Sequence, residues 1–170
     1  MSKTINIDVI FDAEGIMEKY GKGGSQGSPI GIGHQYGYMV ATSNTMSGSG
    51  TGDLVFSALV GDVVRFFGAT ASNNFENSAL IYGLPRYSGD QVFSDFNSRT
   101  FTKSGVAPSG NDVLPAAITQ QQFWFFQADV IATGTENYKV QFALYDRNET
   151  TGQPELYGYY QWDPTISVQG

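Results

Sequence analysis

The sequence contains no cysteine and a single histidine, and these two shortages exclude several kinds of chemistry. Without cysteine the chain can form no disulfide, thiolate metal site, iron–sulfur cluster or thiol nucleophile. His34 cannot by itself supply the nitrogen ligands of a zinc or copper site. A Ser-His-Asp triad would have to use His34, but no G-x-S-x-G motif places a serine nucleophile. We therefore expect no catalytic residue, no metal and no cofactor.

Charged residues are also scarce, at 15% of the chain against roughly 25% in a typical soluble domain. Nine basic residues against 16 acidic ones give a net charge of -7, and no basic patch is present, so nucleic acid and anionic membranes are poor partners. No segment approaches the roughly 20 apolar residues of a membrane-spanning helix, and the N-terminus has no apolar signal-peptide core. These observations predict a cytoplasmic protein.

Aromatic residues and glycine are abundant, with 12 Phe, 10 Tyr, 2 Trp and 21 Gly among 170 residues. This length is typical of one domain, and the aromatic content is too high for a disordered chain. The glycines are expected in turns. We find no internal repeat and no linker, so residues 1–170 are predicted to form a single domain.

Apolar residues recur with a period of two, which is typical of strands with one buried face. In residues 4–11, for example, Ile5, Ile7, Val9 and Phe11 share one face. Residues 60–62 are predicted to form a tight hairpin between two strands. The expected strands are residues 4–11, 36–42, 53–59, 62–67, 78–84, 122–131, 138–146, 155–162 and 165–168.

This pattern predicts an all-β fold, an antiparallel, jelly-roll-like β-sandwich of about nine strands, with a closed barrel as the alternative. The only helix expected is one short turn near residues 12–19. Periodicity fades in residues 85–121, which we interpret as an unusually long connection with at most a short strand near residues 91–96.

Two strands carry large rings on both faces, which is more aromatic surface than one core layer needs. Phe123 and Phe125 are opposite the Trp124 face, and Tyr157 and Tyr159 are opposite the Tyr160 face. Exposed rings suit a protein interface or stacking against sugar rings. Aromatic packing within both sheets would explain the same pattern.

Three blocks together resemble the AidA/PixA family of bacterial inclusion body proteins. They are INIDVIFDAEGIM at 5–17, the block from GTGDLVFSALVGDVVRFF to ENSALIYGL at 50–84, and GYYQWDPTISV at 158–168. The resemblance implies a small β-rich bacterial protein connected with cytoplasmic inclusions or with quorum-sensing-controlled or stationary-phase expression, and it transfers no catalytic residue. With 4 Met, the chain lacks the methionine richness described for inclusion-forming members, which places it nearer AidA.

Two functions follow as hypotheses. The first is a non-enzymatic protein that associates with itself, most simply as a symmetric dimer. The second is a carbohydrate-binding module with contacts in residues 71–77, which include Asn73 and Asn74, or in residues 85–121. Trp162 and Asp163 are interpreted as a structural signature before the last strand, with a ligand pocket that also includes His34 as the alternative.

Overall fold

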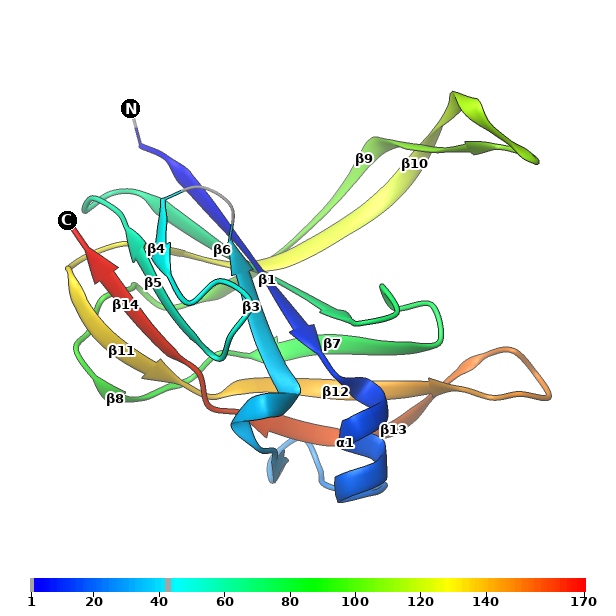
Figure 1. Cartoon of the computed structure of the whole chain (residues 1–170), viewed down its shortest axis with the longest axis horizontal. Coiled ribbons are helices and arrows are strands. Elements are labelled where there is room, and N and C mark those ends of the chain that lie inside the picture. Colours follow the sequence, from blue (N-terminus) through cyan, green and yellow to red (C-terminus); the bar gives the residue numbers. More distant parts are fainter. Residues whose placement is uncertain (1, 42–43) are drawn as a thin grey trace.

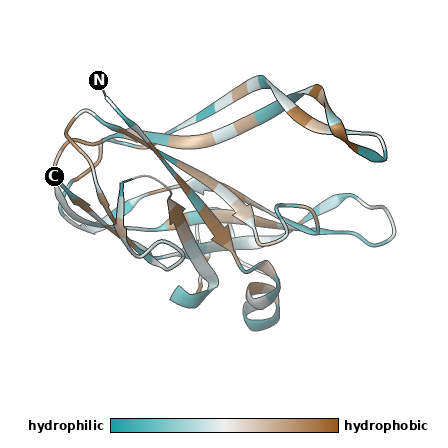
Figure 2. Cartoon of the chain, turned by 45° about the horizontal axis from the view of Figure 1, so that its top comes forward, coloured by the Kyte–Doolittle hydropathy of each residue, from teal (hydrophilic) through white to brown (hydrophobic). Residues whose placement is uncertain are grey.

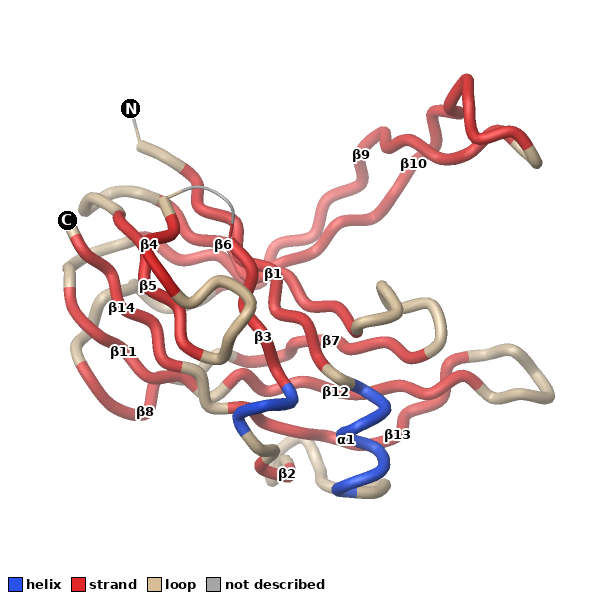
Figure 3. Tube along the Cα trace, viewed as in Figure 1, coloured by secondary structure: helices blue, strands red, loops and turns tan. Residues whose placement is uncertain are grey.

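The computed structural model describes residues 2–41 and 44–170 and confirms the all-β fold (Figure 1). The described residues form fourteen strands in three sheets (Figure 3). Thr42, the end of the predicted strand 36–42, lies outside the described residues. No helix in the described part of the chain has the length and apolar character needed to cross a membrane.

The first sheet has the strand order β3-β1-β6-β10-β9. Its strands, in chain order, are β1 (Thr4–Phe11), β3 (Gly37–Ala41), β6 (Val63–Thr70), β9 (Asn97–Ser109) and β10 (Asp112–Asp129). The alternation read from the sequence is confirmed in β1, where the four predicted core residues are buried and the intervening Asn6 and Asp8 are exposed.

Two further sheets, of order β4-β5-β14-β11-β8 and β2-β13-β12-β7, complete the body. The second sheet contains β4 (Thr45–Ser47), β5 (Asp53–Ser57), β8 (Arg86–Gly89), β11 (Gly134–Tyr138) and β14 (Thr165–Gln169). The third contains β2 (Ile30–Gly31), β7 (Asn77–Gly83), β12 (Val140–Arg147) and β13 (Pro154–Trp162).

One continuous core joins the three sheets. Phe11 of β1 stacks on Phe142 of β12 with ring centroids 3.9 Å apart, and Trp162 of β13 meets Phe11 edge to face. Phe96, from the connection between β8 and β9, meets Phe66 of β6 and Tyr138 of β11 edge to face and so links the first and second sheets. The core therefore fixes the three sheets relative to one another through large aromatic contacts.

The predicted helical turn is a helix of eight residues, α1 (Ala13–Tyr20). The Asp12 carboxylate accepts a hydrogen bond from the Gly15 amide at 3.0 Å, which satisfies one of the free N–H groups at the helix start. Ala13 and Ile16 are buried against the sheets. Gly21 ends the helix with φ +67°, a conformation that favours glycine.

The predicted hairpin at residues 60–62 is wrong in its pairing. A tight turn is present, and the Asp62 carboxylate accepts hydrogen bonds from the Lys3 and Leu59 amides at 2.7 and 3.0 Å, which lower the pKa of Asp62. However, β5 and β6 lie in different sheets, and each pairs with a parallel neighbour. The turn therefore carries the chain from one sheet to another. Because each of the three sheets contains a parallel pair, the sheets are mixed rather than wholly antiparallel.

The interpretation of residues 85–121 as a long connection is also wrong. β8, β9 and most of β10 lie there, while residues 91–96 contain only one isolated bridge, between Phe93 and Val130. β9 and β10 form a long hairpin, and we call its residues 97–124 the arm. The arm projects from the body (Figure 1). Apart from Trp124 at its base, which packs against the core, its residues have no core to select one apolar face, and its pairing shifts register between Asp112 and Ala117. Both effects remove the regular alternation.

The core tyrosine Tyr160 makes stability sensitive to alkaline pH. Its ring is fully buried and its hydroxyl donates to the Gly21 carbonyl at 2.5 Å. Burial raises the pKa of Tyr160 to about 12, whereas an unfolded tyrosine ionises near pH 10. Between these values the unfolded chain loses the proton first, so the free energy of unfolding falls as pH rises.

Urea denaturation at pH 9 and pH 11 checks this prediction. We expect the free energy of unfolding to fall less steeply with pH in Tyr160→Phe than in the unmodified chain. Tyr87→Phe, which changes an exposed ring, should keep the original slope. Equal slopes for Tyr160→Phe and the unmodified chain would refute the assignment.

Candidate functional site

The arm exposes an unusual amount of apolar surface, visible as brown bands along the hairpin in Figure 2. Val106 and Ile118 are cross-strand partners, and each is about 70% exposed. Val113 and Leu114, near the tip, are exposed to the same degree. The outer part of the hairpin, which carries these four residues, packs on nothing, and a two-stranded hairpin of this kind is at best marginally stable in water. The tip therefore has the character of a surface that binds a partner.

An aromatic groove lies at the base of the arm, on the face of the first sheet that points away from the core. It is lined by Phe67, Phe101, Phe123 and Phe125, with Arg65 and Lys103 beside them, and has a volume of about 290 Å³. We call it the Phe groove.

The rings of the Phe groove are arranged around Phe125. Phe101 stacks on Phe125 with centroids 5.8 Å apart, and Phe67 lies 5.1 Å from it on the neighbouring strand. The guanidinium of Arg65 lies 4.8 Å above the Phe125 ring, a cation–π contact. Phe125 is consequently covered, whereas Phe101 and Phe123 remain about 40% exposed.

The sequence placed Phe123 and Phe125 on the face opposite Trp124, and the structure agrees. Trp124 and Phe126 pack against the core from the other side of β10. Phe101 and Lys103 were missed because they fall in the segment interpreted as a connection. Phe67 was also missed as a site residue, although the predicted strand 62–67 contains it. Alternation along that strand places Phe67 on the face opposite Phe66, and this signal could have identified it.

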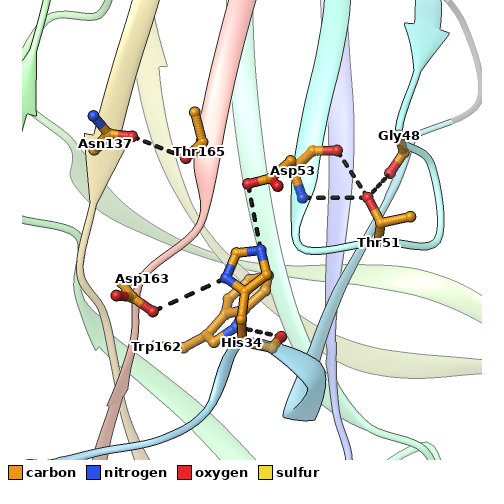
Figure 4. A network of polar contacts seen from close by, with 8 residues as sticks. All are labelled: His34, Gly48, Thr51, Asp53, Asn137, Trp162, Asp163 and Thr165. Atoms are coloured by element: carbon orange, nitrogen blue, oxygen red, sulfur yellow. Dashed lines mark hydrogen bonds and ion pairs between the residues drawn. The ribbon is translucent and has the colours of Figure 1, made fainter.

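Three predicted site residues, His34, Trp162 and Asp163, do come together (Figure 4). The His34 Nε2 atom lies 3.3 Å from the Asp53 carboxylate, and its Nδ1 atom lies 4.0 Å from Asp163. Asp163 also pairs with Lys139 at 3.7 Å. The side chains of His34, Asp53 and Asp163 are about half exposed, and an exposed ion pair such as the one between Lys139 and Asp163 contributes little to stability.

Trp162 lies beneath this cluster, in the core, and its side chain is not accessible to solvent. Its side chain is fully buried, and its Nε1 donates to the His34 carbonyl at 3.0 Å. Gly37 lies directly over the indole, where a Cβ atom would come within 2.5 Å of Trp162 Cε2. A ligand could reach His34 and Asp163 but not the Trp162 ring.

The remaining predicted site residues lie at two separate places. Asn73 and Asn74 form the turn between β6 and β7, and the Asn74 side chain accepts hydrogen bonds from the Thr70 and Ala79 amides at 3.1 Å each. Tyr157 and Tyr159 are half-buried on β13, where Tyr159 packs edge to face against Tyr82. The side chains of Asn74, Tyr157 and Tyr159 are thus engaged in local structure.

The described residues contain no group of three or more His, Asp or Glu side chains placed to hold a metal ion. Among the surfaces described above, the arm and the Phe groove together expose the most apolar side chains. Their chemistry is apolar and aromatic, with a cationic border formed by Arg65 and Lys103.

Comparison with known proteins connects the fold to a family. Residues 3–168 match the family described as PixA inclusion body protein. The crystal structure of an inclusion body protein (PixA) from Burkholderia cenocepacia J2315 is similar, with a TM-score of 0.85 and 27% identity over 99% of this chain and 97% of that one. None of the curated proteins matches this chain. Since the family match covers nearly every residue, the chain belongs to the PixA inclusion body protein family.

Proposed function

We propose that this protein is a non-enzymatic, self-associating component of cytoplasmic inclusions, and that the arm binds a second copy of the chain. One observation carries the proposal: an exposed hairpin presents Val106, Val113, Leu114 and Ile118 to solvent. Membership of a family named for inclusion bodies supports the choice of a second copy as the partner.

The charge distribution also favours a second copy. Within the arm Arg99 and Lys103 are basic and only Asp112 is acidic, whereas the whole chain has nine basic and 16 acidic residues. The arm of one chain therefore meets an acidic body on the other, which favours encounter between copies. A two-fold dimer is the simplest closed arrangement, because each arm can bind the partner in the same way.

The backbone offers a further contact. β9 forms one edge of the first sheet, so its outer N–H and C=O groups have no strand neighbour among the described residues. Exposed edges of this kind pair readily with another chain.

Regulation by quorum sensing or in stationary phase also belongs to the proposal, and only the AidA/PixA resemblance supports it.

Thiol labelling tests where the copies meet. Because the chain has no cysteine, Ile118→Cys or Gln153→Cys introduces a unique thiol, the first on the arm and the second on an exposed turn of the body. We expect the thiol at position 118 to react more slowly as protein concentration rises, because association covers it. The thiol at position 153 should react at a constant rate. A constant rate at both positions would contradict the proposal.

A further inference from the structure

A second hollow lies on the opposite side of β10 from the Phe groove, where the three sheets meet. It has a volume of about 440 Å³ and is bordered by the end of β7, the start of β8, residues 91–96, β10, β11 and β12. We call it the junction cavity. Its size lies in the range of roughly 300–1,000 Å³ found for small-molecule sites.

The walls of the junction cavity are aromatic. Tyr82, Phe96 and Phe126 line it and are only partly buried, so their rings are available to a ligand. Phe96 is held by edge-to-face contacts with Phe66 and Tyr138, each at 5.3 Å. The Phe96 ring is thus held in place by the core before any ligand arrives.

Polar side chains stand beside these rings. Gln91, Asp95 and Gln141 line the cavity, and none of the three side chains makes a hydrogen bond to another described residue. Gln141 lies opposite Gly83 in the β12–β7 register, and a Cβ atom at position 83 would come within 2.7 Å of Gln141 Oε1. Glycine therefore leaves the Gln141 amide free to bind.

The floor of the cavity is held by a buried, hydrogen-bonded carboxylate. The buried Glu136 carboxylate accepts hydrogen bonds from the Val92 and Phe93 amides at 2.6 and 3.0 Å and pairs with Arg86 at 3.6 Å. The buried Tyr138 hydroxyl has no hydrogen-bond partner among the described residues. This hydroxyl is enclosed beside the Glu136 carboxylate, and burial and that carboxylate both raise the pKa of Tyr138, so a ligand in the cavity would contact the polar groups nearer the surface.

We propose that the junction cavity binds a neutral sugar of one or two rings. A sugar ring offers an apolar C–H face to the aromatic walls and several hydroxyls to the two glutamine amides and the Asp95 carboxylate. Because Arg86 already compensates Glu136, Asp95 leaves the cavity with a negative charge, which disfavours an anionic ligand. The site is independent of the arm, since Phe126 and Phe125 lie on opposite faces of β10.

Ligand-detected NMR with the full chain tests this proposal. The probes are glucose, galactose, mannose, fucose, N-acetylglucosamine, maltose, cellobiose and lactose, each at about 10 mM so that millimolar affinities are seen. Choline is included because an aromatic site beside a carboxylate also suits a quaternary ammonium ion. We expect at least one sugar, and not choline, to show binding.

Variants locate the site. Gln91→Ala with Asp95→Ala removes two exposed polar groups and should weaken sugar binding about tenfold or more. Gln141→Trp fills the cavity and should abolish binding, with folding checked by circular dichroism. Gln153→Ala, a matched exposed glutamine on another turn, should leave binding unchanged. Absence of binding by every sugar, binding of choline alone, or sugar binding unaffected by both cavity variants would overturn the proposal.

Discussion

Replacing both Val106 and Ile118 with lysine is expected to convert the self-associated protein into a monomer. The two side chains face each other across the arm and are each about 70% exposed. In the free chain the lysines would remain in water, but in the complex their charges would have to be desolvated within an apolar contact. We expect the dissociation constant to rise about 100-fold or more, as for loss of a central interface contact.

Sedimentation equilibrium measures this change, and a matched variant serves as control. Leu59→Lys with Val60→Lys alters two apolar residues of similar exposure on a turn of the body, so it should remain associated. Neither double variant should alter the free energy of unfolding by more than about 0.5 kcal/mol per substitution, because all four side chains are on the surface. Equal dissociation by both variants would place the contact outside the arm.

Replacing Trp162 with alanine is expected to cost about 3–5 kcal/mol of folding stability. The side chain is fully buried against Phe11 and Gly37, so its loss leaves a cavity between the first and third sheets. Trp162→Phe keeps a ring but loses the hydrogen bond to the His34 carbonyl, so a smaller loss of about 1–2 kcal/mol is expected.

Urea denaturation of these variants distinguishes a structural tryptophan from a ligand-binding one. Asp163→Asn, beside Trp162 but nearly half exposed, should alter stability by less than about 1 kcal/mol, the usual limit for an exposed ion pair. A loss below about 1 kcal/mol for Trp162→Ala would contradict the packing described for β13.

Those parts of the fold that have a core on one side could be predicted from the sequence. The alternation of Ile5, Ile7, Val9 and Phe11 identified β1, because a half-buried strand requires one apolar face. Pairing between strands could not be predicted in the same way. Nothing in residues 53–70 shows that β5 and β6 enter different sheets, because that choice depends on contacts with distant strands.

The candidate sites were predictable only in part, for a related reason. Phe123 and Phe125 were found because they lie in the predicted strand 122–131, whereas Phe101, the cross-strand partner of Phe123, lies on the edge strand β9 in the segment interpreted as a connection. The junction cavity brings together Tyr82, Phe96 and Glu136 from three separate segments. Each of these residues alone fits an ordinary strand or turn position, so only the tertiary structure shows that they share a cavity.

The most direct test of self-association through the arm compares the unmodified chain with a chain whose arm is shortened. Sedimentation equilibrium measures the mass of each across micromolar concentrations. In the shortened chain an Asn-Gly turn replaces residues 104–120 and joins Lys103 to its cross-strand partner Gln121. We predict twice the chain mass for the unmodified protein and a single chain mass for the shortened one. A monomeric unmodified chain at every concentration, or a shortened chain that still dimerises, would contradict the account.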